Sequence, residues 1–137
     1  MDVRFIELMP MRNNCSFGPE AFLPGEEILK VLPEAETVPY DGGTAKLYKI
    51  PNGKGRIGLI RPVSAHFCSS CNRIRITADG KIKPCLHSDE EYNLKGCSKE
   101  EMIEIMQAAI WSKPQWHGTL SYEQKSRTHR TMNQIGG

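Results

Sequence analysis

Three cysteines constrain this chain more than any other feature of its sequence. Two serines separate Cys68 from Cys71, and thirteen residues separate Cys71 from Cys85. Two thiolates three residues apart on a loop can face the same metal ion or cluster, but a third ligand must return from elsewhere in the fold. The chain must therefore reverse its direction between Cys71 and Cys85, and we expect a β-hairpin there.

The loop of this hairpin decides where Cys85 points. In a three-residue loop at Ala78-Asp79-Gly80, with the glycine in the left-handed conformation, Thr77 pairs with Lys81. Counting back, this register pairs Arg73 with Cys85. A two-residue loop would turn the cysteine to the other face of the hairpin. We favour the three-residue loop because an aspartate-glycine pair can adopt it and because a shared site requires it.

Turn residues and hydrophobic periodicity predict the other elements. A capping box at Ser98 and Glu101 starts a helix of about three turns with an apolar stripe. Residues 113–137 are polar and weakly periodic, so we expect an irregular tail that is ordered only if it docks. The predicted ranges are 3–9 for a first strand, 24–32 for a short helix, 44–50 and 56–63 for a first hairpin, 73–77 and 81–86 for the second hairpin, and 98–111 for the last helix.

These elements predict an α+β fold with an antiparallel sheet of two hairpins and flanking helices. The 137 residues are enough for one domain, and the apolar fraction of 39% is typical of a packed core. A net charge of +2 is too small to indicate a nucleic-acid-binding face. No stretch has the length of a membrane span, and the N-terminus lacks a signal pattern. We therefore expect a cytoplasmic protein with no membrane partner and no nucleic-acid partner.

The three cysteines fit two kinds of metal site. A [4Fe-4S] cluster held by three thiolates keeps one iron open, and an open iron can act as a Lewis acid on a substrate atom. In a Cys3His zinc site, His66 or His87 would be the fourth ligand, and the chain would be a non-catalytic interaction module. Close-set cysteines in a reducing compartment bind metal more often than they form disulfides. The spacing supports both kinds of metal site about equally, and the remaining alternative is that the three cysteines are merely buried and inert.

A long stretch around the cysteines carries a family resemblance. Residues 66–81 read HFCSSCNRIRITADGK, and Cys85-Leu86 follows. This stretch closely resembles the C-terminal cluster motif of the GTP 3′,8-cyclase family, radical S-adenosylmethionine (SAM) enzymes of molybdenum cofactor biosynthesis. The resemblance extends over all 137 residues and includes the segments RFIELMP at 4–10, TAKLY at 44–48, Lys113-Pro114, His117 and MNQIGG at 132–137.

The resemblance implies roles for five residues near the second hairpin. Cys68, Cys71 and Cys85 would hold a [4Fe-4S] cluster whose open iron binds the guanine base of GTP. Arg73 and Arg75 would bind the phosphates. This role suits two guanidinium groups two residues apart, because they share one face of a strand and can grip phosphate oxygens in pairs. The alternative for the two arginines is a solvated strand face.

The C-terminus matches the family's diglycine tail. By resemblance, Gly136 and Gly137 would reach into the active site and help to trigger the chemistry. Two residues without side chains can enter a narrow channel, although a terminal diglycine is otherwise most often a frayed end. Arg127, His129 and Arg130 are candidate anion contacts beside this tail.

In this family the complete enzyme converts GTP to (8S)-3′,8-cyclo-7,8-dihydroguanosine 5′-triphosphate, the first step of molybdopterin cofactor biosynthesis. An N-terminal half with its own three-cysteine motif binds S-adenosylmethionine and a second [4Fe-4S] cluster. This chain has no such motif, and Cys15 and Cys97 are isolated, so we expect it to be inactive by itself. The implied partners are GTP, the N-terminal radical-SAM half and, in the pathway, cyclic pyranopterin monophosphate synthase.

The implied architecture is a single C-terminal domain, 1–137, that completes a partial (βα)6 radical-SAM barrel. We divide it into a barrel-derived strand and helix (1–40), a cluster-bearing sheet and helix (41–112) and a tail ending in Gly-Gly (113–137). A barrel strand without its neighbour would expose an unpaired edge. We therefore expect self-association as a homodimer, or a need for the N-terminal half.

Overall fold

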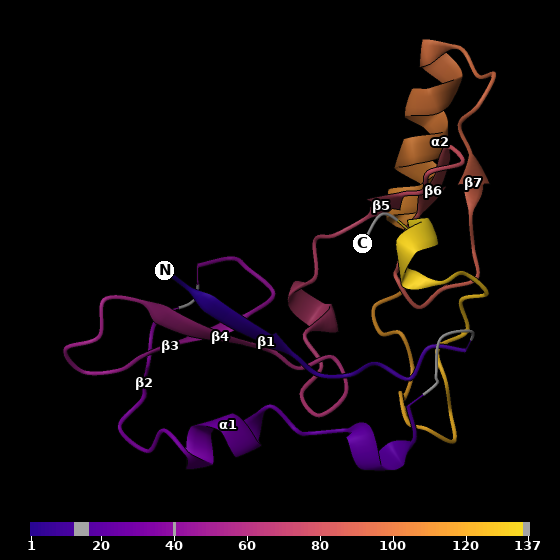
Figure 1. Ribbon diagram of the computed structural model, residues 1–137. Coiled ribbons are helices and arrows are strands. Elements are labelled where there is room, and N and C mark those ends of the chain that lie inside the picture. Colours follow the sequence, from indigo (N-terminus) through magenta and orange to yellow (C-terminus); the bar gives the residue numbers. More distant parts are fainter. Residues whose placement is uncertain (13–16, 40, 136–137) are drawn as a thin grey trace.

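The computed structural model describes residues 1–12, 17–39 and 41–135, and it arranges them in two arms that meet at a corner (Figure 1). One arm holds a four-stranded sheet in the order β1-β4-β3-β2, and the other holds a three-stranded sheet in the order β5-β6-β7. The strands are β1 (Val3–Ile6), β2 (Glu36–Thr37), β3 (Lys46–Lys49), β4 (Arg56–Ile60), β5 (Arg75–Ile76), β6 (Lys81–Lys83) and β7 (Tyr92–Asn93). The helices are α1 (Glu26–Lys30), α2 (Lys99–Trp111) and the 3-10 turns η1 (Pro19–Ala21), η2 (Cys68–Ser70) and η3 (Met132–Ile135).

The α+β prediction is confirmed, but the single antiparallel sheet is wrong. The two hairpins lie in separate sheets, and β1 pairs with β4 in parallel, so that the first sheet is mixed. Because β4 has β3 on one side and β1 on the other, the second hairpin cannot pair with the strand that precedes it in the chain. The connection between β4 and β5, which includes η2, then carries the chain to the other arm.

The second hairpin has the predicted three-residue loop. Thr77 donates its backbone N–H to the carbonyl of Lys81 at 2.8 Å, and Gly80 has a φ of +78°. Arg75 pairs with Lys83 in the same register. The ladder is shorter than predicted, because strand pairing ends at these two residues and does not reach Cys85.

The last helix begins as predicted but packs less than its apolar stripe suggests. Ser98 and Glu101 form the reciprocal capping box at the start of α2. However, Ile103 and Ile110 are about half exposed, and Trp111 is 88% exposed. Among the residues that the structure describes, α2 contacts chiefly β6, and it stands at the outer end of the second arm (Figure 1).

The tail after α2 is irregular, as expected, and it docks on the rest of the chain. Ser126, Thr128 and Ile135 are at most 1% exposed. The backbone N–H of Ser126 donates to the carbonyl of Pro10 at 2.9 Å, which joins the tail to the segment that follows β1. Within the described ranges, neither α1 nor α2 combines the length and the apolar character that a membrane crossing requires.

The first strand forms an edge of the four-stranded sheet. Val3, Phe5 and Ile6 are 41–60% exposed, although all three are apolar. No other described segment pairs with the outer edge of β1. This agrees with the expected unpaired edge, while association with a second copy or with an N-terminal half stays a prediction.

A buried carboxylate joins the end of β1 to two other segments. Glu7 is 4% exposed and accepts backbone hydrogen bonds from Gly25 at 2.9 Å, Val63 at 3.0 Å and Ser64 at 2.9 Å, together with one from the Ser64 hydroxyl. Burial raises the pKa of this carboxyl, but the hydrogen bonds from Gly25, Ser64 and Val63 outweigh burial, so the pKa lies below its ordinary value. Glu7 thereby fixes the start of the connection that leads to the cysteines.

Replacing Glu7 with alanine is expected to lower the free energy of unfolding by about 3 kcal/mol, because one buried and two part-buried backbone donors lose their acceptor. A carboxyl with a lowered pKa stabilises the fold above its unfolded pKa, near 4.5, and this contribution disappears as the pH falls through the folded value. Glu7→Gln should therefore flatten the loss of stability between about pH 5 and pH 3. Urea unfolding across this range measures both effects.

The matched control is Glu27→Ala, which removes only an exposed ion pair with Lys30 and should change stability by less than about 1 kcal/mol. An equal loss for both variants would contradict the role given to Glu7.

Candidate metal and anion site

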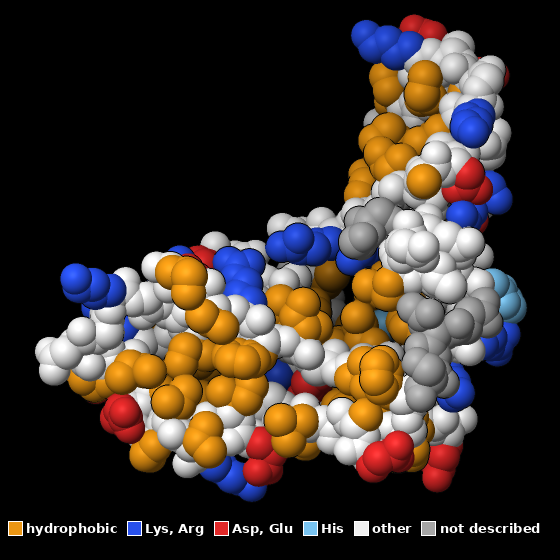
Figure 2. All heavy atoms as spheres, in the orientation of Figure 1, with side chains coloured by type: hydrophobic (Ala, Val, Ile, Leu, Met, Phe, Trp, Pro, Cys, Tyr) orange, Lys and Arg blue, Asp and Glu red, His pale blue; other side chains and the backbone are white. Residues whose placement is uncertain are grey.

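The three cysteines of the sequence motif line one cavity. The turn η2 places Cys68 and Cys71 at neighbouring positions, with the N–H of Cys71 donating to the carbonyl of Cys68 at 3.1 Å. Cys85 follows β6 after Pro84. All three are half-buried free thiols, and all three line a cavity of about 230 Å³, called here the cysteine cavity. Figure 2 shows a hollow at the corner between the arms, with apolar side chains inside it and Lys and Arg side chains on its rim.

The pKa of Cys68 reflects its burial and the two neighbouring cysteines. Burial raises the pKa of the Cys68 thiol, and the neighbouring Cys85 and Cys71 raise it further. The backbone N–H of His117 and the ammonium group of Lys113 act in the opposite direction. A metal or cluster that binds the thiolate would therefore also relieve the cost of burying it.

The two predicted phosphate ligands line the same cavity. Arg73 is exposed, and Arg75 is half-buried. The guanidinium of Arg75 donates to the carbonyl of Ile135 in the tail at 3.4 Å. The structure thus brings three thiols and two guanidinium groups to one cavity, as the register of the hairpin predicts. Gly136 and Gly137 lie outside the described residues.

Sequence reasoning missed a further cation at this site. Lys113 lines the cysteine cavity, and its ammonium group donates to the carbonyls of Arg73 at 2.8 Å and Pro84 at 3.0 Å. It therefore bridges the two chain segments of the hairpin just where strand pairing has ended. No spacing in the sequence indicates this role, because Lys113 is 40 residues from Arg73. Only the family resemblance of Lys113-Pro114 draws attention to the position.

Lys113→Met is expected to weaken the retention of iron by the reconstituted chain by about 10- to 100-fold, the usual cost of losing a group that orients metal ligands. The methionine keeps the apolar length of the side chain but removes both hydrogen bonds to the hairpin. The measurement is iron per chain during titration with a chelator. Lys125→Met changes an exposed lysine of the tail and should retain iron as the parent does. Equal retention by the two variants would show that the bridge is unimportant.

The histidines proposed as a fourth zinc ligand lie in different places. His87 is 5% exposed, lines the cysteine cavity, and has its Nδ1 3.0 Å from the hydroxyl of Ser126. Burial lowers the pKa of His87 to about 3, with smaller contributions from the nearby His117 and Arg75. His66 is exposed and lines another cavity, and its Nδ1 is 2.9 Å from the carbonyl of Pro62.

Side chains that could bind a single metal ion do not converge in the described part of the chain. No group of three His, Cys, Asp or Glu side chains among residues 1–12, 17–39 and 41–135 is placed so that it could hold one ion. The residues of all three thiols nevertheless line the cysteine cavity.

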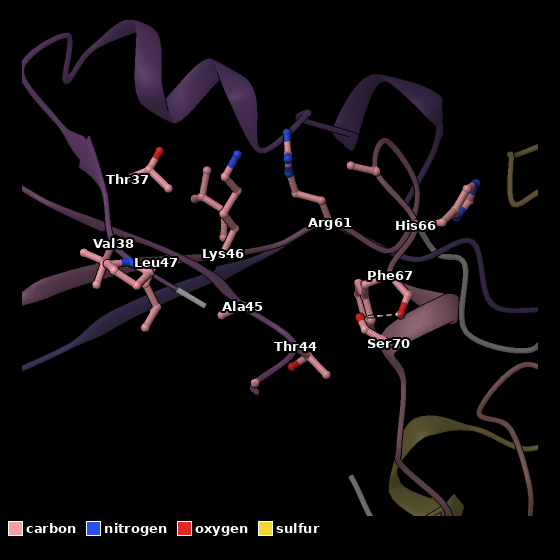
Figure 3. Close-up of a pocket in the computed structure, with 14 residues that line it drawn as sticks. Thr37, Val38, Thr44, Ala45, Lys46, Leu47, Arg61, His66, Phe67 and Ser70 are labelled. Atoms are coloured by element: carbon pink, nitrogen blue, oxygen red, sulfur yellow. Dashed lines mark hydrogen bonds between the residues drawn. The ribbon is translucent and has the colours of Figure 1, made fainter. Parts of the chain in front are cut away.

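A larger cavity, of about 510 Å³, lies between β3, the end of β4 and the turn η2 (Figure 3). It is lined by His66 but by none of the three cysteines and neither of the predicted phosphate-binding arginines. Lys46 and Arg61 extend in the same direction in Figure 3, but the guanidinium of Arg61 is bound by Glu26 at 2.6 Å. The predicted chemistry therefore belongs to the smaller cavity.

The remaining candidate residues lie away from the cysteine cavity or outside the described ranges. Cys97 is half-buried near the carbonyls of Asn93 and Lys95 and does not line the cavity. Arg130 pairs with carboxylates of the chain itself. Two tail residues, Arg127 and His129, are exposed, and Cys15 is not among the described residues.

The fold and the cavity define an α+β domain that combines a three-thiol site with basic side chains. Residues 1–119 match the family described as Molybdenum Cofactor Synthesis C, and the chain belongs to this family. This match confirms the family resemblance of the sequence. It indicates that the chain takes part in molybdenum cofactor biosynthesis.

Curated relatives named GTP 3′,8-cyclase match the chain over nearly its whole length. The protein of Alkaliphilus oremlandii is 44% identical over 143 residues, covering 100% of this chain, and that of Alkaliphilus metalliredigens is 41% identical over 141 residues with the same coverage. The protein of Desulforamulus reducens is 40% identical over 146 residues, covering 98% of the chain. In all three cases the chain spans 44% of the relative's length, which fits a C-terminal fragment of such an enzyme.

Proposed function

We propose that this chain is the substrate-binding half of a GTP 3′,8-cyclase and that it binds GTP beside one [4Fe-4S] cluster. One observation carries the proposal: the three thiols and the two guanidinium groups that the sequence singles out line the same cavity. The whole-length similarity to proteins named GTP 3′,8-cyclase supports it. A cavity of this kind can hold a charged nucleotide next to a metal group.

Each residue has a distinct task in this proposal. The thiolates of Cys68, Cys71 and Cys85 hold the cluster, which when bound supplies an open iron as a Lewis acid for the guanine base. Arg73 and Arg75 bind the triphosphate through paired, charge-assisted hydrogen bonds. The ordered site fixes the nucleotide in one orientation, and orientation is what a protein chiefly contributes to cofactor chemistry.

The complete reaction requires parts beyond this chain. In the proposed enzyme, an N-terminal half forms the partial (βα)6 barrel next to β1 and binds S-adenosylmethionine and a second [4Fe-4S] cluster. The exposed apolar side chains of β1 support this docking, because an edge strand favours pairing with another strand. The product would be (8S)-3′,8-cyclo-7,8-dihydroguanosine 5′-triphosphate, and cyclic pyranopterin monophosphate synthase would use it. The isolated chain should have no turnover.

A Cys3His zinc module is the competing function, and one observation favours it. His87 lines the cysteine cavity together with the three cysteines. Against zinc stands the whole-length similarity to proteins named GTP 3′,8-cyclase, the family whose resemblance implies a [4Fe-4S] cluster. We therefore favour the cluster.

Anaerobic reconstitution with iron and sulfide tests the proposal. The expected result is about four irons per chain and an absorbance spectrum that changes when GTP is added. Metal analysis of the same sample distinguishes the two functions, because a zinc module would carry one zinc, remain colourless and show no response to GTP. That second result would end the proposal.

A further inference from the structure

We propose that Arg130 is a positioning residue that anchors the C-terminal tail as one wall of the cysteine cavity. It does so by an ion-pair bridge to the second hairpin. The effect of this anchor on turnover rests on the proposed function, but the anchor itself does not. The sequence suggests Arg130 only as a candidate anion contact, and the family match assigns it no role.

The guanidinium of Arg130 binds two carboxylates that belong to different segments. Its Nε donates to Glu91 at 2.5 Å, and its Nη2 donates to Glu91 and to Asp79, each at 2.7 Å. Asp79 lies in the loop of the second hairpin, and Glu91 directly precedes β7. The side chains of Arg130 and Glu91 are only 19% and 15% exposed, so the pair is shielded from solvent more than an ordinary surface pair. A guanidinium that binds one carboxylate through two nitrogen atoms is fixed in orientation, in addition to being attracted by the opposite charge.

Arg130 is not needed to neutralise Glu91, the less exposed of the two carboxylates that it binds. Glu91 also lies 3.4 Å from the ammonium group of Lys81 and 3.8 Å from that of the fully buried Lys83. Without Arg130, Glu91 would still have two cationic partners. Loss of the guanidinium therefore leaves no buried charge unpaired, and its main effect should fall on the tail rather than on the stability of the sheet.

The chain that follows Arg130 runs directly to the cavity. The N–H of Thr131 donates to the side chain of Gln134 at 3.0 Å, and the N–H of Gln134 donates back to the carbonyl of Thr131 at 3.0 Å. Met132, within the resulting turn η3, lines the cysteine cavity. Ile135 is fully buried, and its carbonyl accepts from Arg75 at 3.4 Å. The described tail is thus fixed at two points, with a wall of the cavity between them.

The anchor has a consequence for the phosphate-binding guanidinium. Arg75 faces the cavity and also holds the tail at Ile135. A tail that is released at Arg130 would also reduce the time that Ile135 spends near Arg75. Arg130 would in this way set the position of Ile135 without touching any ligand itself.

Digestion of the isolated chain with carboxypeptidase tests the anchor, because the enzyme must pull Ile135 out of its buried position. Release of Ile135 and Gln134, followed by mass spectrometry, should be at least about tenfold faster from Arg130→Met than from the parent chain. Arg130→Lys should fall between them, since an ammonium group cannot bind Glu91 through two nitrogens.

The control is Arg127→Met, which changes an exposed arginine of the same tail and should leave the rate unchanged. Equal rates for Arg130→Met and Arg127→Met would overturn the anchor. If Arg130→Met does not fold, Asp79→Asn removes one of the ion pairs and should accelerate release in the same direction.

The effect on turnover is tested in the complete enzyme that carries this chain as its C-terminal half. Arg130→Met should lower kcat when the tail is intact, and it should cause no further loss when Gly136 and Gly137 are deleted. Equal losses in both backgrounds would overturn the positioning role, because a merely structural residue would act independently of the tail. If even the unmodified enzyme has no turnover with GTP, the proposed function fails, and the digestion rates still decide whether Arg130 anchors the tail.

Discussion

Cys85→Ser is expected to abolish the bound cluster, reducing iron to a small fraction of the parent value and removing the brown colour after reconstitution. Cys85 is the only one of the three proposed ligands that follows a strand of the second sheet, so Cys68 and Cys71 would be left on one short turn. Two thiolates cannot complete a cluster that normally takes three or four protein ligands. Iron and sulfide analysis with the absorbance spectrum provides the measurement.

A matched cysteine is available as the control for this experiment. Cys97 is half-buried, as Cys85 is, but it does not line the cysteine cavity. Cys97→Ser should therefore retain the parent's iron content and spectrum. If Cys85→Ser retains iron and Cys97→Ser loses it, the ligand assignment is wrong. If Cys85→Ser retains a single zinc ion, the site is a structural zinc site.

Replacing both Arg73 and Arg75 with alanine is expected to weaken GTP binding by the reconstituted chain at least about 100-fold. Hydrogen bonds to charged groups contribute ~1.5–3 kcal/mol each, so the loss of two guanidinium groups exceeds that factor. The affinity for guanosine, which has no phosphate, should change much less. Calorimetric titration of both ligands distinguishes a phosphate contact from a general disturbance of the site.

The tail supplies a control of the same charge. Arg127→Ala removes one exposed arginine that does not line the cavity, and it should leave the affinity for GTP within about twofold of the parent at moderate salt. An unchanged affinity in the variant with both replacements would assign Arg73 and Arg75 to a solvated strand face. A matched loss of guanosine and GTP binding would show that the arginines support the shape of the cavity instead.

Local signals in the sequence predicted the part of the fold that carries the cysteines. The Asp79-Gly80 pair correctly indicated the three-residue loop, because a glycine adopts a positive φ without strain. The same register predicted that Arg73 and Arg75 would share a face with Cys85, and all three line one cavity. The capping box at Ser98 predicted the start of α2, since both of its hydrogen bonds form within four residues.

Contacts between distant segments could not be predicted in this way. The single sheet was wrong because the sequence does not reveal that β1 occupies the free edge of β4. Lys113 reaches Arg73 across 40 residues, and Arg130 reaches Asp79 across 51, with no spacing rule to link them. The apolar stripe of α2 correctly predicted a helix but not its packing, because Ile103, Ile110 and Trp111 remain largely exposed.

The cysteine cavity lies at the corner between the two arms, so a group bound there would contact both of them. Cys68 and Cys71 belong to the connection that leaves the first sheet, which Glu7 ties to β1, whereas Cys85 follows β6 of the second sheet. A group held by all three thiolates would therefore crosslink the two arms. Binding of that group would restrict the angle between the arms, so the relative orientation of the arms would depend on whether the site is occupied.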